Sequence, residues 1–163
     1  MERVLRQYFN YSDFRPGQKE VITSIVRGVD VIGLFPQGMG KSLCYEILPY
    51  IQQGRVLIIS PLISLMEDQV RRIKQRGEKR VVALTSQLTH EERELVKSRL
   101  SHYRYIFCSP EMLMKSEFAT ALQSLSYSAI TLDEAHCISQ WGYDFRPEYL
   151  QVGEWIQKLA NRP

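Results

Sequence analysis

The segment PQGMGKS contains residue types that can hold a phosphate group. Gly38 and Gly40 allow the backbone to curl with its N–H groups inward, Lys41 can reach terminal phosphates, and the Ser42 hydroxyl can ligate Mg²⁺. The strict pattern for such a loop has another glycine six residues before the lysine, where this chain has Phe35. The alternative interpretation of these residues alone is a plain glycine-rich turn before a helix.

Two adjacent acids, Asp133 and Glu134, follow the apolar run AITL. In a nucleotide site Asp133 would hold Mg²⁺, and Glu134 would position and deprotonate the attacking water. An acidic helix N-cap is the alternative. Together with the phosphate loop, the pair favours catalysis, with Lys41, Asp133 and Glu134 as catalytic residues. Ser42 and Asp133 are then the expected ligands of Mg²⁺.

These residues need a scaffold, and apolar runs rich in β-branched residues predict five strands that alternate with helices. The strands are expected at 29–35, 55–60, 81–86, 104–109 and 129–133. Capping boxes are expected to begin two of the helices, at Ser64 with Glu67 and at Thr89 with Glu92. This alternation predicts an α/β fold with a parallel sheet covered on both faces, and ligands bind at the carboxyl ends of such strands.

The composition is that of a soluble globular protein, with 163 residues of which 44% are hydrophobic and 24% charged. A net charge of +3 permits nucleic acid as a partner. No apolar run is long enough for a membrane span, so no membrane partner is expected. The three cysteines and three histidines are scattered, so we expect no zinc site and a cytoplasmic protein, associated with the nucleoid if it is bacterial.

Further segments resemble the first motor lobe of the RecQ family of DNA helicases in superfamily 2, from about residue 8 to about residue 150. FRPGQ at 14–18 resembles the family's adenine-recognition motif, although a turn before a helix is the simpler alternative. The resemblance implies a RecA-like P-loop NTPase fold, with three α/β/α layers and a mostly parallel sheet, and ATP as ligand. Gln18 would read the base edge, Tyr11 would stack on the ring and Arg15 would assist. The ATP-binding residues implied are Tyr11, Arg15, Gln18, Gly38, Met39, Gly40, Lys41 and Ser42.

Three segments resemble the family's contacts with DNA: SPLISLMEDQV (60–70), SPEML (109–113) and HCISQWGYDFRPEY (136–149). The last is aromatic-rich and contains arginine, which suits stacking on unpaired bases. The alternatives are ordinary helix caps for the serines and core packing for the aromatic residues. The resemblance implies that His136 and Gln140 couple the ATP site to this loop. The DNA-binding residues implied are Ser64, Ser86, Ser109, Trp141, Phe145 and Arg146.

Two departures from the family pattern stand out. Gln37 and Met39 lie where the family usually has threonine or glycine in the phosphate loop, and Tyr143 lies where many members have histidine. Side chains at these positions can alter nucleotide affinity or coupling. The glycines, lysine and serine that hold the phosphates are retained.

The resemblance implies an ATP-dependent DNA helicase of 3′→5′ polarity that acts with Mg²⁺ on single-stranded and partly duplex DNA. Residues 1–163 match one lobe and stop before the family's Ser/Thr-Ala-Thr motif, so we expect the second lobe to be missing. We therefore expect weak binding of ATP, little hydrolysis and no unwinding from this chain alone. An ATP-gated nucleic-acid-binding module and an RNA helicase are the alternatives, and a small-molecule kinase is disfavoured because FRPGQ and DEAH have no role there.

Overall fold

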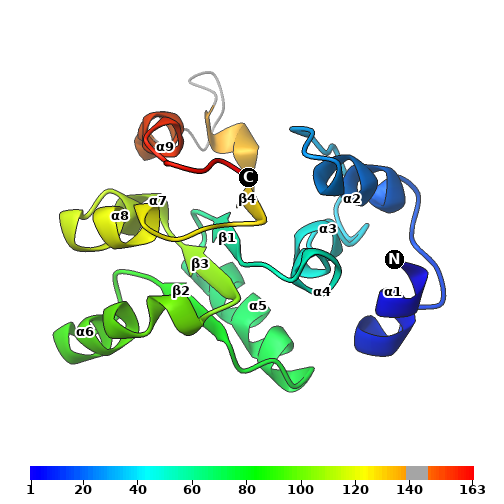
Figure 1. Ribbon diagram of the computed structural model, residues 1–163, viewed down its shortest axis with the longest axis horizontal. Helices are drawn as coiled ribbons and strands as arrows, with labels where there is room; N and C mark the ends of the chain where they lie inside the picture. The colour runs from blue at the N-terminus through cyan, green and yellow to red at the C-terminus, as the bar shows by residue number, and fades with distance from the viewer. Residues whose placement is uncertain (139–146) are drawn as a thin grey trace.

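A four-stranded parallel sheet forms the centre of the molecule, in a computed structural model that describes residues 1–138 and 147–163 (Figure 1). The strands lie in the order β2-β3-β1-β4. Their bounds are β1 Val56–Ile59, β2 Val81–Leu84, β3 Tyr105–Cys108 and β4 Ala129–Leu132. The pairs β1–β3, β1–β4 and β2–β3 are all parallel, and Ile58 lies opposite both Phe107 and Thr131.

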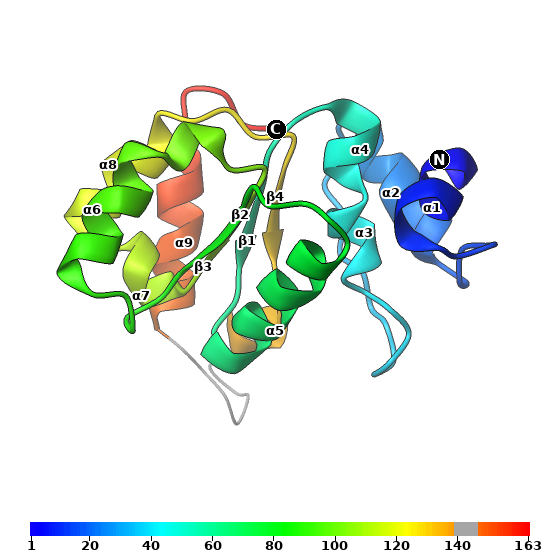
Figure 2. The same cartoon turned by 90° about the horizontal axis from the view of Figure 1, so that it is seen from below.

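Helices cover both faces of the sheet (Figure 2). On one face lie α1 Glu2–Phe9, α2 Gln18–Val26, α3 Leu43–Glu46, α4 Leu48–Gln52 and α5 Ile63–Gln75. The other face carries α6 His90–Ser98, α7 Pro110–Leu113, α8 Ser116–Gln123 and α9 Glu148–Gln157. Two short 3₁₀ turns, Leu100–His102 and Ala135–Ile138, complete the described elements. The predicted three-layer α/β/α fold is therefore confirmed.

The core consists of two clusters, one on each face of the sheet. In β1 the side chains of Leu57 and Ile59 belong to one cluster, and those of Val56 and Ile58 belong to the other. This alternation follows from the two-residue period of a strand, and it explains why all four residues are fully buried. In the described part of the chain no helix is long and apolar enough to cross a membrane.

The strand predicted at 29–35 is wrong. This segment does not join the sheet, and Ile32 and Leu34 are about nine-tenths exposed. A strand buried on both faces would have to bury the charged side chain of Asp30, and Gly33 weakens any strand interior. The β-branched residues indicate only an extended backbone, because pairing depends on tertiary context.

Two predicted helix starts have opposite outcomes. Thr89 and Glu92 form the predicted capping box of α6, in which the Thr89 Oγ1 accepts from the Glu92 N–H. The box predicted at Ser64 is wrong, because α5 already begins at Ile63 with Leu62 as its N-cap. Ser64 therefore lies inside the first turn, where its hydroxyl cannot act as the N-cap.

Candidate nucleotide site

Lys41 meets both predicted acids at the carboxyl edge of the sheet, although 92 residues separate it from Asp133. Its Nζ lies 3.0 Å from Asp133 Oδ1 and forms a second ion pair with Glu134. Asp133 directly follows β4, and only 6% of its side chain is exposed. The topology therefore brings together the three residues predicted to be catalytic.

Hydrogen bonds place the two acids in a defined geometry. The Glu134 N–H donates to Asp133 Oδ1 at 3.1 Å, and Glu134 has a left-handed backbone with φ of 53°. The buried Tyr149 hydroxyl donates to the Asp133 carbonyl oxygen at 2.9 Å. His136 Nδ1 lies 3.4 Å from Glu134 Oε2. The histidine predicted to couple the ATP site to DNA thus touches the predicted general base.

The electrostatics of the lysine reflect these contacts. Burial alone would lower the pKa of Lys41, but its hydrogen bonds with Glu134 and Asp133 outweigh burial and raise that pKa. The amine therefore carries its positive charge at neutral pH, as a phosphate ligand requires.

The FRPGQ segment holds the phosphate loop through its backbone. Gln18 Nε2 donates to the carbonyl oxygens of Gly40 at 2.9 Å and Met39 at 3.2 Å. The same side chain accepts from the Arg15 N–H at 2.9 Å, and Arg15 Nη1 donates to the Gly38 carbonyl oxygen at 2.5 Å. Gln18 is 2% exposed, so these two segments form one unit.

A cavity of about 230 Å³ lies between FRPGQ and the phosphate loop. Tyr11, Arg15, Gln18 and Ser42 line it, and Tyr11 is half-exposed. The structure thus gathers the predicted adenine-recognition residues beside the loop predicted to hold phosphate.

The same cavity contains residues that the sequence analysis missed. Glu46, Arg72 and Arg76 also line it. Glu46 is buried in α3 and is ion-paired with Arg76, which follows α5. Burial raises the pKa of Glu46, and the positive charge of Arg76 opposes that shift. Glu46 lies four residues after Ser42, and residues at this spacing are neighbours on one face of a helix. This spacing was the feature of the sequence that could have indicated Glu46 as a site residue.

The residues present fit a Mg²⁺–phosphate ligand. Gly38 and Gly40 have positive φ values of 79° and 75°, a conformation that glycine adopts at little cost. Ser42 and Asp133 supply the hard oxygen donors that Mg²⁺ prefers. The described residues contain no cluster of three or more His, Cys, Asp or Glu arranged for a metal. Mg²⁺ in nucleotide sites is typically held by one or two protein groups and by substrate phosphates.

The residues predicted to bind DNA have different environments. Ser64 is exposed in the first turn of α5, and Ser86 is exposed after β2. Ser109 is buried, and its Oγ accepts from the Met112 N–H at 3.3 Å as the N-cap of α7. Ser109 therefore caps a helix, which was the alternative interpretation of this residue from the sequence. The predicted residues Gln140, Trp141, Phe145 and Arg146 lie outside the described residues.

Replacing Gly40 by alanine is expected to weaken ATP binding at least tenfold. An added Cβ would lie 2.9 Å from Gln18 Nε2, in a backbone conformation that side chains rarely adopt. Gly28→Ala is the matched control, because Gly28 has the same φ of 75° and a Cβ there would meet nothing within 4 Å. Both variants should lose about 1 kcal/mol of stability from backbone strain. Thermal melts and ATP titrations will separate the two effects, and equal ATP affinity in both variants would contradict the role of the Gln18–loop contact.

The phosphate loop, with its glycines and lysine, lies beside an Asp-Glu pair at the carboxyl edge of a parallel sheet. This arrangement defines a P-loop nucleotide-binding architecture. Residues 15–161 match the family model described as DEAD/DEAH box helicase. The chain belongs to that family.

Curated relatives extend this similarity over the whole chain. The chain is 45% identical over 163 residues to a probable ATP-dependent DNA helicase RecS of Bacillus subtilis, covering 100% of this chain and 33% of the relative. It is 44% identical to the ATP-dependent DNA helicase RecQ of Haemophilus influenzae, covering 98% of this chain and 26% of the relative. The RecQ resemblance predicted from the motifs is confirmed. The chain spans about a third or less of the length of these relatives.

Proposed function

We propose that this chain is the Mg²⁺–ATP-binding motor lobe of an ATP-dependent DNA helicase. The observation that carries the proposal is the meeting of Lys41 with Asp133 and Glu134. Such a lysine–acid cluster beside a phosphate loop serves attack of water on a γ-phosphate. Family membership and the names of the relatives support the same conclusion.

Each residue of the cluster has a distinct proposed role. Lys41 turns from the two carboxylates to the phosphates, where its charge stabilises the transition state. Ser42 and Asp133 hold Mg²⁺, which when bound neutralises phosphate charge. Once the lysine has left, Glu134 is available to orient the attacking water and accept its proton.

Gln18 is proposed to connect adenine to the phosphate loop. Its amide nitrogen already donates to two loop carbonyls, and its oxygen accepts from Arg15. Recognition of the adenine edge therefore requires Gln18 to exchange at least one loop contact for the base. That exchange would make the conformation of the loop sensitive to the identity of the nucleotide.

The nucleic-acid strand is proposed to bind across the carboxyl edge of the sheet. Ser64 and Ser86 are exposed at the carboxyl ends of β1 and β2, and exposed hydroxyls near helix starts suit phosphate contacts. We propose single-stranded and partly duplex DNA as the substrate, 3′→5′ polarity, a second lobe that completes the motor, and a cytoplasmic location with the DNA.

The proposal is tested by ATP hydrolysis in the full-length protein, measured without nucleic acid, with single-stranded DNA and with single-stranded RNA at equal nucleotide concentration. We expect stimulation of at least tenfold by DNA and less by RNA. Stimulation by RNA alone would indicate an RNA helicase. ATP binding without hydrolysis under every condition would indicate an ATP-gated binding module.

A further inference from the structure

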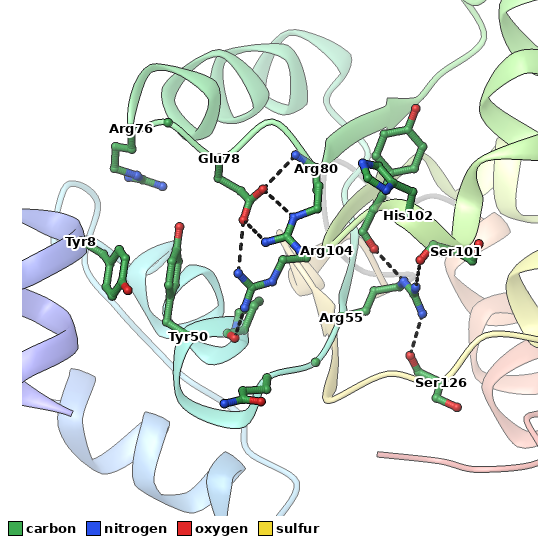
Figure 3. A pocket seen from close by; sticks show the side chains of 15 residues that line it. Tyr8, Tyr50, Arg55, Arg76, Glu78, Arg80, Ser101, His102, Arg104 and Ser126 are labelled. Atoms are coloured by element: carbon green, nitrogen blue, oxygen red, sulfur yellow. Dashed lines mark hydrogen bonds and ion pairs between the residues drawn. The ribbon is translucent and has the colours of Figure 1, made fainter.

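A second and larger cavity, of about 930 Å³, lies at the amino-terminal edge of the sheet, opposite the carboxyl edge that holds Lys41 (Figure 3). Arginine directly precedes three of the four strands, as Arg55 before β1, Arg80 before β2 and Arg104 before β3. All three line this cavity, together with Arg76 after α5. We call it the arginine pocket.

The arginine pocket has an excess of positive charge. Among its described lining residues Glu78 is the only carboxylate. Arg80 binds it with Nε and Nη2, both at 3.0 Å, and Arg104 Nη1 lies 3.2 Å from it. One carboxylate therefore serves two guanidinium groups, which leaves one positive charge uncompensated.

Arg55 adds a second uncompensated charge. Its guanidinium donates to the carbonyl oxygens of Tyr103, Ser126 and Ser101 at 2.8, 3.1 and 2.7 Å. Figure 3 shows it directed toward Ser101 and Ser126, away from Glu78. In the described part of the chain it has no carboxylate partner.

The guanidinium groups are also held in place before any ligand arrives. Arg104 donates to the Pro49 carbonyl oxygen, and its guanidinium carbon lies 5.1 Å from the centre of the Tyr50 ring. Tyr50 in turn stacks on Tyr8, with ring centres 4.4 Å apart. Fixed arginine side chains lose little rotamer freedom on binding, which favours affinity. Within the described residues, Arg80 bonds Glu78 through its Nε and Nη2 and makes no hydrogen bond with its Nη1 group.

We propose that the arginine pocket binds phosphate groups, as a second anion site distinct from the phosphate loop, with Arg76 lining both cavities. The excess of about two positive charges matches one terminal phosphate, which carries about −1.5 to −2. It also matches two neighbouring phosphodiesters of a strand, which carry one negative charge each. Planar guanidinium forks suit phosphate oxygens. The phosphate can belong to a nucleic-acid strand or to a free polyphosphate, and the experiment separates these two sources.

The test uses the chain with Lys41→Ala, which weakens phosphate binding at the nucleotide site. Tripolyphosphate and a single-stranded DNA 12-mer are titrated at several salt concentrations. We expect binding of at least one probe, and Arg80→Gln should weaken it about five- to tenfold and reduce the salt slope by about one for the 12-mer. Arg99→Gln is the matched control, because it removes the same charge from an exposed residue outside the pocket.

Each outcome decides the proposal. Arg80-dependent binding of tripolyphosphate alone assigns the pocket to free polyphosphates, and Arg80-dependent binding of the 12-mer assigns it to nucleic acid. Binding of neither probe, or equal losses in Arg80→Gln and Arg99→Gln, overturns it. If Arg80→Gln fails to fold, the melting temperature of the Lys41→Ala chain decides, because at least one of the two probes should raise it and an unchanged value with both contradicts the proposal.

Discussion

Replacing Glu134 by glutamine is expected to slow ATP hydrolysis by a factor of about 10² to 10⁴, the range typical of a lost general base. ATP affinity should stay within about threefold, because glutamine removes one of the two carboxylates that hold Lys41 and leaves the phosphate loop intact. Glutamine keeps the size of the side chain but cannot accept a proton from water.

The measurement is steady-state hydrolysis by the full-length protein with saturating single-stranded DNA, together with ATP binding at equilibrium. Glu91→Gln is the matched control, since Glu91 is exposed in the first turn of α6 on the other face of the sheet. Hydrolysis within fivefold of the unmodified protein would exclude Glu134 as the base. An equal loss in Glu91→Gln would show that the effect is not local.

Replacing Lys41 by alanine is expected to weaken ATP binding by a factor of about 10 to 100, which corresponds to the loss of about 1.5–3 kcal/mol from a charge-assisted hydrogen bond. The variant should also be less stable by about 1–3 kcal/mol, because Asp133 is buried and loses the cation 3.0 Å from its Oδ1. Both effects follow from the loss of one amine, which contacts Asp133 in the free chain and is proposed to contact the phosphates in the complex.

Titration with a fluorescent ATP analogue and urea unfolding measure the two effects separately. Lys97→Ala is the control, because Lys97 lies on α6 and its ion pair with Glu94 is long and exposed at 3.8 Å. A Lys41→Ala chain that binds ATP normally would contradict the phosphate-loop assignment. Normal stability would instead contradict the inferred strength of the Lys41–Asp133 ion pair.

Much of the fold was predictable because local patterns and tertiary structure agree. The apolar runs before Ser60, Ser109 and Asp133 became parallel strands, of which β1 and β3 are buried and β4 is partly buried. The alternation of strands with helices placed their ends at one edge. Lys41 and Asp133 were expected to meet at this edge, and they do, although the strand predicted before the phosphate loop is wrong. The capping box at Thr89 formed as predicted, with both of its hydrogen bonds between residues three positions apart.

Most failures concern features that depend on distant residues, whereas the box predicted at Ser64 failed locally because α5 begins at Ile63. A strand at 29–35 was predicted to join the sheet, but pairing depends on a neighbouring strand and on the cost of burying Asp30. The Gln18 bonds to the loop and the Glu46–Arg76 ion pair join residues that are 22 and 30 positions apart. The arginines before the strands are about 25 residues from one another, so only the folded sheet reveals that they share a pocket.

The most direct test of the ATP-binding account is a crystal structure of the chain with a non-hydrolysable ATP analogue and Mg²⁺. We predict the phosphates on the backbone N–H groups of residues 38–41, with the Lys41 Nζ on a phosphate and no longer on Glu134. We also predict adenine beside Tyr11 and Gln18. Phosphates bound elsewhere, with the Lys41 ion pairs to Asp133 and Glu134 unchanged, would contradict the account.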